Sequence, residues 1–552
     1  MDPGQPLPYH HREDFTPEER KVLARFFTNL DGPVFALINL PEVVKGALFA
    51  RYSRSAKSIR RLFLDEFLAD PDTGISIIAD RLEDEDPLVN LRRAEQLYQR
   101  VFYQYGDDSV AQLGSAHLAC EQASNVLTKV LERGRIASYL EQSTRYISYD
   151  QPLGGRYRYV VPPELEGSPL RGDYVELMET LFDAYSRLVA DLRTVYERSS
   201  PRSEDVSEAV WKATVRAKAC DVARGLLPAA TMSNVGIHAS GQAYEQLLLR
   251  MRAHPLGEAQ AYAGMMLEEL RKVIPSFLTR VDRPDRGGAW SRYLAETRRN
   301  LEELASVLPS AEPESEPRVD LVDWDPEAET KVVAAALYPV SELDERRLLD
   351  LARSMSDEQR ARIMAALVGE RTNRRHKPGR AMERTTYRFD VVCDFGAFRD
   401  LQRHRMMTIE WQRFTTRLGF AVPPELEESQ AQVWEDLMAR CSDVYERIRG
   451  DHGADVAQYV VPFAALVRFT VEMNPRQAFH LIELRSQPQG HPSYRWVVQE
   501  MHRLIRDVAG HRMIADAMRF VDTAPVEWER LEAERRAEAR RRAAAATVGG
   551  DG

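Results

Sequence analysis

The hexapeptide Val-Pro-Pro-Glu-Leu-Glu occurs twice in this chain, at residues 161–166 and at residues 422–427. Three further markers surround each copy in the same order. An Arg-x-Arg lies upstream, a Leu-Pro or Val-Pro step lies downstream, and a helical segment after that step ends with Leu-Arg. In the first copy these markers occupy residues 133–135, 227–228 and 249–250. In the second copy they occupy residues 403–405, 461–462 and 484–485. Chance does not produce this order, so the sequence predicts a tandem duplication.

The chain length agrees with a duplication, because 552 residues exceed what one hydrophobic core usually supports. Residues 305–317 are rich in Pro, Ser and Glu and lack apolar periodicity, which is typical of a linker. We therefore expect a first domain at 1–304, a linker at 305–317 and a second domain at 318–527. The remaining residues, 528–552, form a highly charged tail that we expect to be a solvated helix fraying into disorder.

Each copy is predicted to fold as an α+β domain in which helices dominate. Each opens with a short strand followed by a helix, at 34–39 and from Pro41 in the first copy, and at 319–324 and 326–337 in the second. Residues 387–395 alternate in polarity and contain enough β-branched side chains to predict a strand. Residues 174–196 and 243–274 have apolar side chains at helical spacing.

Composition excludes several classes of function. The net charge of -10 gives no bulk reason to expect nucleic-acid or membrane binding. The first residues are too charged for a signal peptide, and no apolar run is long enough for a membrane span, so a cytoplasmic protein is expected. The four cysteines (Cys120, Cys220, Cys393 and Cys441) lie far apart, which argues against a zinc site or a disulfide framework.

Two arginine clusters are the strongest candidates for a binding site. Residues 133–146 and 403–413 interleave arginines with Ser, Thr, Gln and Tyr, and such a set of donors is suited to phosphate oxygens. The alternative is a solvated arginine face paired with Glu141 or Glu410. A second candidate is the Arg224 to Pro228 step, in which Gln458 replaces the arginine in the second copy. A third is Asn474-Pro475-Arg476, for which helix capping by Asn474 is the structural alternative.

Taken together, these motifs resemble the flavin-dependent thymidylate synthase family. The pattern comprises Arg-His-Arg followed by seven residues and a serine, an Arg-x-x-Leu-Pro step, and Asn-x-Arg with a second arginine nine residues later. Residues 106–110 look like the family's preceding loop, and Glu383 stands where the family has a glutamate. The resemblance covers nearly the whole chain, as two diverged copies of the family's domain.

The resemblance implies FAD as cofactor, with NADPH and methylenetetrahydrofolate as co-substrates, in the reductive methylation of dUMP to dTMP. It also implies an assembly of four domains, so we expect this chain to form a homodimer that acts as a pseudo-tetramer. No cysteine nucleophile is required, and the cofactor performs the hydride transfer while the protein positions and polarises.

Carried over residue by residue, the family's site is divided between the copies. The first copy keeps the residues that hold the nucleotide, and with them we count Arg135: Arg135, Glu141, Gln142, Ser143, Arg145 and Arg224. The second copy keeps those that bind the flavin: Glu383, Arg403, His404, Arg405, Asn474 and Arg476. Arg250 and Arg485 are the candidates for the catalytic arginine that polarises the uracil ring.

The losses are complementary as well. Gly134 replaces the histidine in the first copy, where Ala239 and Gly241 stand in the places expected for Asn-x-Arg. In the second copy Arg413, Thr415 and Gln458 replace nucleotide-holding residues. The sequence therefore predicts one composite site shared by the two repeats. Two alternatives remain: one-carbon transfer to another pyrimidine nucleotide such as uridylate, and a flavin- or nucleotide-binding protein without turnover.

Overall fold

A computed structural model describes residues 7–69, 112, 114–204, 206–309 and 316–524 of the chain. The predicted loop at 106–110, the tail at 528–552 and residues 310–315 of the linker lie outside these residues.

The chain forms two compact units, and these do not follow the order of the repeats. Unit 1 comprises residues 1–188, 226–312 and 439–461, whereas unit 2 comprises 189–225, 313–438 and 462–552. Each unit thus contains one repeat's sheet together with a segment that belongs to the other repeat. The domain boundaries inferred from the sequence stay a prediction about where the repeats begin and end.

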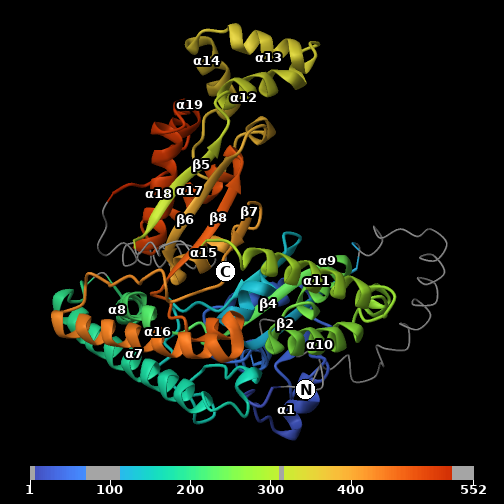
Figure 1. Ribbon diagram of the computed structural model, residues 1–552, viewed down its shortest axis with the longest axis vertical. Coiled ribbons are helices and arrows are strands. Elements are labelled where there is room, and N and C mark those ends of the chain that lie inside the picture. Colours follow the sequence, from blue (N-terminus) through green and yellow to red (C-terminus); the bar gives the residue numbers. More distant parts are fainter. Residues whose placement is uncertain (1–6, 70–111, 113, 205, 310–315, 525–552) are drawn as a thin grey trace, which may run out of the picture. The chain divides into compact units, whose positions relative to one another are not determined.

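Unit 1 is built on a four-stranded antiparallel sheet in the order β1-β2-β4-β3 (Figure 1). Its strands are β1 (Val34–Leu37), β2 (Ser115–Ser124), β3 (Ala137–Glu141) and β4 (Met232–Ser240). Helix α10 packs against β1 and β2, and α9 packs against β4. The helical elements that begin in this unit are α1 (Pro17–Leu23), α2 (Glu42–Tyr52), α3 (Ile59–Leu62), η1 (Phe63–Leu68), α6 (Asn125–Leu131), η4 (Pro163–Leu165), α7 (Arg171–Ser199), α9 (Gly241–Arg252), α10 (Gly257–Arg271), η6 (Pro275–Leu278), α11 (Gly287–Ala305) and η9 (Gln458–Val460).

Unit 2 repeats this architecture with a four-stranded antiparallel sheet in the order β5-β6-β8-β7. Its strands are β5 (Arg318–Trp324), β6 (Tyr387–Asp394), β7 (Thr408–Trp411) and β8 (Leu466–Met473). Helix α18 packs against β5 and β6, while α12, α13 and α14 form a helical group at one end of β5 (Figure 1). The helical elements that begin in this unit are α8 (Glu208–Ala223), η5 (Arg224–Leu226), α12 (Ala328–Leu337), η7 (Tyr338–Val340), α13 (Glu345–Ser354), α14 (Asp357–Val368), η8 (Arg380–Glu383), α15 (Phe395–Gln402), α16 (Glu428–Ala457), α17 (Pro475–Arg485), α18 (Pro492–Asp507) and α19 (Arg512–Asp516).

The two sheets correspond strand by strand, which agrees with a duplication. Ser124 ends β2 opposite Met232 and caps α6, and Asp394 ends β6 opposite Leu466 and caps α15. Both caps accept the backbone N–H three residues on, as short polar side chains do at helix N-termini. The main difference is a bulge in β2 between Cys120 and Ala123, where Gln122 adopts a φ of 58°.

The segments exchanged between the units occupy the same place in each repeat. Each comes before the Leu-Pro or Val-Pro step, and each is fixed by a backbone hydrogen bond of the same kind. In unit 1 the Ala230 N–H donates to the Tyr459 carbonyl over 2.9 Å, and in unit 2 the Ala464 N–H donates to the Gly225 carbonyl over 2.9 Å. The exchange therefore places Arg224 of the first repeat in unit 2 and Gln458 of the second repeat in unit 1.

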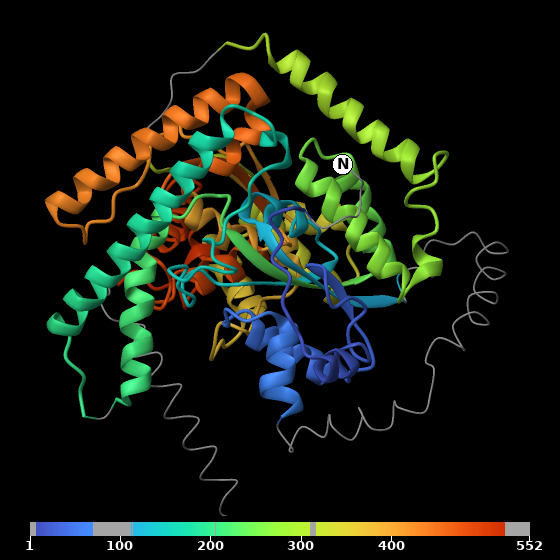
Figure 2. The same ribbon diagram turned by 90° about the horizontal axis from the view of Figure 1, so that it is seen from below.

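The N-terminal elements α1 to α3 close one side of unit 1. Their apolar side chains join those of β1 in a buried cluster that includes Phe26, Phe27, Phe35 and Tyr52. Figure 2 shows these elements grouped together in blue. No helix among the described residues is long and apolar enough to cross a membrane.

Candidate active site

Asp400, on the last turn of α15, faces three arginines from three different segments of unit 2. Its carboxylate oxygens lie 3.7 Å from Arg224 Nη1, 3.8 Å from Arg403 Nη1 and 3.5 Å from Arg485 Nη1. The Asp400 side chain is only 12% exposed. One largely buried carboxylate among three guanidinium groups leaves an excess of positive charge, and such a site favours an anionic ligand.

Arg224 is the nucleotide-holding arginine that the sequence assigns to the first repeat, and it lies in unit 2 beside second-repeat residues. It caps the C-terminus of α8 and is 3% exposed, and its Nη2 atom has no hydrogen-bond partner. Gly396, on the first turn of α15, makes room for it. A Cβ at Gly396 would lie 3.2 Å from Arg224 Nη2 and 3.0 Å from Asp394 Oδ1.

Arg485 is oriented by His404 and Asp400. Its Nε–H donates to His404 Nε2 over 2.8 Å, and its guanidinium stacks 5.3 Å from the centre of the Tyr494 ring. Burial, reinforced by the charge of Arg485, holds the pKa of His404 well below its usual value. His404 is therefore neutral with its proton on Nδ1, because Nε2 accepts the bond from Arg485.

Helix α17, which carries Arg476 and Arg485, is itself anchored in unit 2. Arg371 donates to both carboxylate oxygens of Glu483, over 2.7 and 2.5 Å, and both side chains are buried. Asn474 caps the helix by accepting from the Gln477 N–H over 2.9 Å. The capping role that the sequence offered as an alternative for Asn474 is thus present.

The remaining predicted flavin residues in this unit are more exposed. Arg476 donates to Glu383 over 3.2 Å and to the Pro378 carbonyl over 3.0 Å, and its side chain is 41% exposed. Arg403 is 34% exposed, and Arg405 follows two residues later in the loop that leads to β7. Arg403 and Arg476 are thus partly accessible, as contacts to a phosphate-bearing ligand require, and Arg405 is half-buried.

The corresponding place in unit 1 has lost most of these features. Counted from the caps of α6 and α15, Val130 stands at the position of Asp400, and Val126 at that of Gly396. Gly134 stands at the position of His404, where the Tyr139 hydroxyl lies 2.6 Å from the place of a Cβ. Gln458 takes the position of Arg224, is buried, and donates to the Asp455 carbonyl over 3.1 Å.

The register of α9 also separates Arg250 from Arg485. Met232 and Leu466 lie opposite the caps of α6 and α15, and eight residues after each stands the cap of the next helix, Ser240 for α9 and Asn474 for α17. Eleven residues after each cap stand Met251 and Arg485, so the equivalence of Arg250 with Arg485 that the motifs suggested does not hold by this register. By the same count Ser240 and Gln242, rather than Ala239 and Gly241, stand at the positions of Asn474 and Arg476. Arg250 lies one residue earlier on α9, near Gly134 and Tyr139.

The predicted nucleotide segment 141–145 lies in unit 1, at the end of β3. The Glu141 side chain is fully buried 3.6 Å from Lys129 Nζ, and the Gln142 side chain donates to the Ser55 carbonyl over 2.6 Å. Ser143 Oγ accepts from the Arg145 N–H over 3.4 Å, whereas Arg135 is exposed in the loop before β3. The role predicted for these residues stays a prediction.

Sequence reasoning missed Asp400 and Gly396. The signal for Asp400 was available, since an acid three residues before Arg403 lies on the same face of a helix. Its contact with Arg224 was not visible, because it depends on the exchanged segment.

A family model for thymidylate synthase complementing protein matches residues 64–276 and 320–510, once in each repeat. The chain belongs to the thymidylate synthase complementing protein family. The resemblance stated from the sequence is confirmed, and so is the α+β fold of two tandem family domains.

Relatives of two kinds match the chain. A "UPF0159 protein" of Chlamydia muridarum is 39% identical over 530 residues, which cover 95% of this chain and 99% of the relative. A flavin-dependent thymidylate synthase of Clostridium tetani is 29% identical over 174 residues, which cover 31% of this chain and 64% of the relative. Among solved structures, a UMP/dUMP methylase of Streptomyces cacaoi bound with 5-Br dUMP matches at 19% identity and a TM-score of 0.31, covering 39% of this chain and 99% of that one.

The chemistry of the donors decides which cofactors the site fits. Within the described residues no cluster of His, Cys, Asp and Glu is suited to a metal ion. The four cysteines are all buried, and burial raises the pKa of the Cys441 thiol to about 12, which disfavours its thiolate form. Exposed and buried guanidinium groups, one with an unpartnered Nη2, fit phosphate-bearing ligands such as a dinucleotide cofactor and a nucleotide.

Proposed function

We propose that this protein reductively methylates C5 of deoxyuridylate, using FAD, methylenetetrahydrofolate and NADPH, at a composite site built by both repeats. Membership of the family and the flavin-dependent thymidylate synthase of Clostridium tetani support the reaction class. The observation that carries the composite site is the ion pairing of Asp400 with Arg224 of the first repeat and with Arg403 and Arg485 of the second.

In this proposal the exchange of segments explains the pattern of losses. Unit 2 receives Arg224, and its own repeat supplies Arg403, His404, Arg405, Arg476 and Arg485. Unit 1 receives Gln458 and has Val130, Gly134 and Met251 at matching positions. Unit 2 would combine a nucleotide-holding arginine of the first repeat with the flavin residues of the second, and unit 1 would not, so the chain would hold one active site rather than two.

Each arginine of this set in unit 2 has a separate task. Arg224 binds the phosphate of the nucleotide, because its buried guanidinium has donors to spare. Arg403, Arg405 and Arg476 are the residues that would hold the phosphates of FAD, which when bound supplies the hydride for the reaction. Arg485 donates to a carbonyl oxygen of the uracil ring and stabilises negative charge there as C5 reacts.

His404 keeps Arg485 ready for this task. As a neutral acceptor it fixes the direction of the Arg485 Nε–H, and Asp400 engages Nη1. Nη2 of Arg485 makes no hydrogen bond among the described residues and is available to the substrate. Protonation of His404 would break this arrangement, and its depressed pKa prevents that at neutral pH.

The proposal is tested by expressing the full chain in a thymidine-requiring bacterium and by recording the absorption of the purified protein. Rescue of growth by a yellow protein is the expected result. A protein that stays colourless after FAD is added would exclude the flavin-dependent reaction. A yellow protein that fails to rescue growth would point to another pyrimidine nucleotide or to binding without turnover.

The division of labour is tested by two variants with a shared control. Arg224→Gln is expected to weaken binding of deoxyuridylate at least about tenfold and to retain flavin, since a charge-assisted hydrogen bond is lost. Arg403→Gln is expected to weaken flavin binding. Arg503→Gln, at an exposed residue paired with Glu500, is the control and should change neither. Loss of flavin in Arg224→Gln would contradict the assignment.

A further inference from the structure

A polar pocket of about 190 Å³ lies in unit 1, whereas the arginines around Asp400 belong to unit 2. One wall is the N-terminal segment from Pro8 to His11, and the other is the loop from Leu153 to Tyr159; Gln122 and Met232 complete the lining. This loop is part of an insertion in the first repeat. From the end of β3 at Glu141 to the repeated hexapeptide at Val161 there are twenty positions, whereas from the end of β7 at Trp411 to the hexapeptide at Val422 there are eleven.

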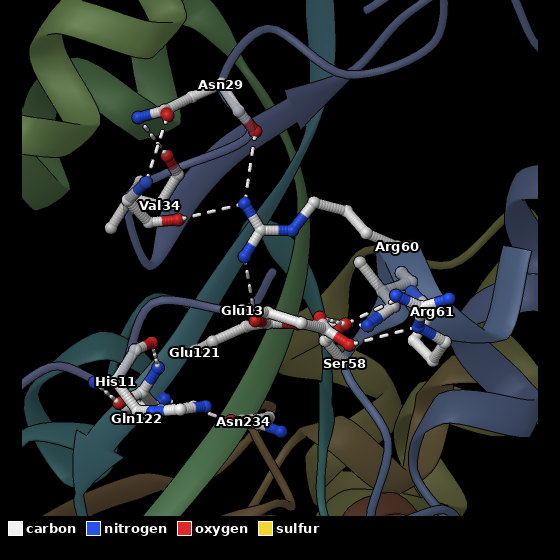
Figure 3. Close-up of polar contacts among 12 residues, drawn as sticks. His11, Glu13, Asn29, Val34, Ser58, Arg60, Arg61, Glu121, Gln122 and Asn234 are labelled. Carbon is white, nitrogen blue, oxygen red and sulfur yellow. Dashed lines mark hydrogen bonds and ion pairs between the residues drawn. The ribbon is translucent and has the colours of Figure 1, made fainter. Parts of the chain in front are cut away.

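The N-terminal wall is held in place by the bulge in β2. Gln122 accepts from the His11 N–H over 2.7 Å and donates to the His11 carbonyl over 2.8 Å, so its side chain clamps the backbone of His11 (Figure 3). The Gln122 N–H in turn donates to the Asn234 side chain over 2.9 Å. A non-glycine residue at a φ of 58° persists only where its surroundings hold it, and here its effect is to fix one wall of the pocket.

The opposite wall approaches His11 closely. Gly154 has a φ of 60°, and a Cβ there would lie 2.5 Å from His11 Nδ1. Only glycine combines this conformation with this contact. The loop is thus shaped to close against the N-terminal segment.

Arg158 is the residue that indicates a ligand. It is 9% exposed, its Nη2 donates to the Ser148 carbonyl over 2.6 Å, and its guanidinium stacks 4.1 Å from the centre of the Tyr149 ring. It pairs with no carboxylate among the residues that the structure describes, and its Nε has no hydrogen-bond partner. A buried guanidinium is usually paired with a counter-charge, so this arrangement is suited to binding an anion.

The other polar groups of the pocket do not supply that charge. The hydroxyls of Tyr157 and Tyr159 donate to Asp183 and Glu179 over 2.8 and 2.7 Å, which engages these carboxylates. His10 bonds to the Tyr262 hydroxyl over 3.1 Å and accepts from the Leu7 N–H. Arg156 lies exposed over the Tyr159 ring and adds a second positive charge.

We propose that this pocket binds a small oxyanion, phosphate or the phosphate group of a monoester, through Arg156 and Arg158. Guanidinium groups match the geometry of phosphate oxygens, and the volume is below the roughly 300 Å³ at which pockets for larger organic ligands begin. The bound anion joins the N-terminal segment to the loop of the first repeat. This site is independent of the proposed active site, since it uses none of its residues.

The test measures binding of inorganic phosphate to the full chain by calorimetry, in an Arg224→Gln background that removes the nucleotide arginine. Saturable binding is expected, and Arg158→Gln and Arg156→Gln should each weaken it at least about tenfold. Arg299→Gln, at an exposed residue of α11, is the matched control and should leave it unchanged. Because Arg156 is exposed, its variant stays informative even if Arg158→Gln fails to fold.

A second arm compares inorganic phosphate with ribose 5-phosphate. Tighter binding of the monoester identifies the phosphate group of a larger ligand, and tighter binding of phosphate identifies the free ion. Absence of saturable binding for both, or equal binding by Arg156→Gln and the parent, overturns the proposal.

Discussion

Asp400 is the residue on which the arrangement of the candidate active site depends. Asp400→Asn keeps the shape of the side chain but leaves Arg224, Arg403 and Arg485 without their shared carboxylate. We expect the free energy of unfolding to fall by about 1–3 kcal/mol, because a buried charged partner is lost. Denaturant titration measures this change. Asp436→Asn, at an exposed residue of α16, should shift the midpoint little, and an equal loss there would remove the special role of Asp400.

Gly396 gives a second prediction, which concerns space rather than charge. In Gly396→Ala the added Cβ would press on the Arg224 guanidinium at 3.2 Å and on Asp394 at 3.0 Å. We expect weaker binding of deoxyuridylate with flavin binding retained, as measured by calorimetry and absorption. Gly46→Ala is the matched control, since its Cβ would meet nothing within 4 Å in the middle of α2. Unchanged nucleotide affinity in Gly396→Ala would mean that Arg224 can move without consequence.

At the scale of elements, the sequence predicted the repeated core but not the exchange. The strand predicted at 387–395 is β6, because alternation is a local signal, and the helix predicted at 326–337 is α12, which begins at Ala328 so that Pro326 precedes it. The helical stretch predicted at 243–274 is two helices, α9 and α10, broken before Leu256 where Pro255 removes a backbone donor.

The exchange of the segments 189–225 and 439–461 has no local signal. It rests on contacts between residues more than a hundred positions apart, such as Arg224 with Asp400 and Tyr459 with Glu258. For the same reason the motifs could name Arg224 as a nucleotide residue but could not place it beside Arg485. The offset of one residue between Arg250 and Arg485 is likewise visible only from strand pairing and helix caps, and the catalytic role of either arginine stays a prediction.

The segment exchanged into unit 1 is fastened by Tyr459. Its hydroxyl donates to Glu258 Oε2 over 2.6 Å, and the Ser124 hydroxyl donates to the same carboxylate. Tyr459→Phe should lower the free energy of unfolding by about 1–3 kcal/mol, since a buried carboxylate loses a donor. Tyr445→Phe in the same segment is the control, because Tyr445 is buried but its hydroxyl makes no hydrogen bond with the residues that the structure describes. Equal stability of the two variants would show that Tyr459 does not fasten the segment.

Glu258 also makes the stability of the contact between Tyr459 and unit 1 depend on pH. Burial raises its pKa from 4.5 to about 7, so the folded state binds a proton that the unfolded state releases between these values. Its contribution to stability is therefore fully present below pH 4.5 and is lost as the pH rises through about 7. The stability of the parent relative to Glu258→Gln should fall over this window in denaturant titrations. Glu268→Gln, at an exposed residue of the same helix, should run parallel to the parent, and a parallel Glu258→Gln curve would contradict the shift.

At the scale of the whole molecule, the exchange makes the two repeats dependent on each other. A chain of residues 318–552 would lack Arg224 and the 189–225 segment of unit 2, and a chain of residues 1–304 would lack the 439–461 segment of unit 1. Each fragment would expose the surface that the missing segment covers, which favours unfolding or aggregation.

We therefore expect neither fragment alone to bind both flavin and deoxyuridylate, and co-expression of the two to restore binding in a co-purifying complex. Co-expression with Arg224→Gln in the first fragment should restore flavin but not nucleotide binding. If the second fragment alone bound deoxyuridylate as tightly as the full chain does, the composite site would be wrong, because the nucleotide would then need nothing from the first repeat.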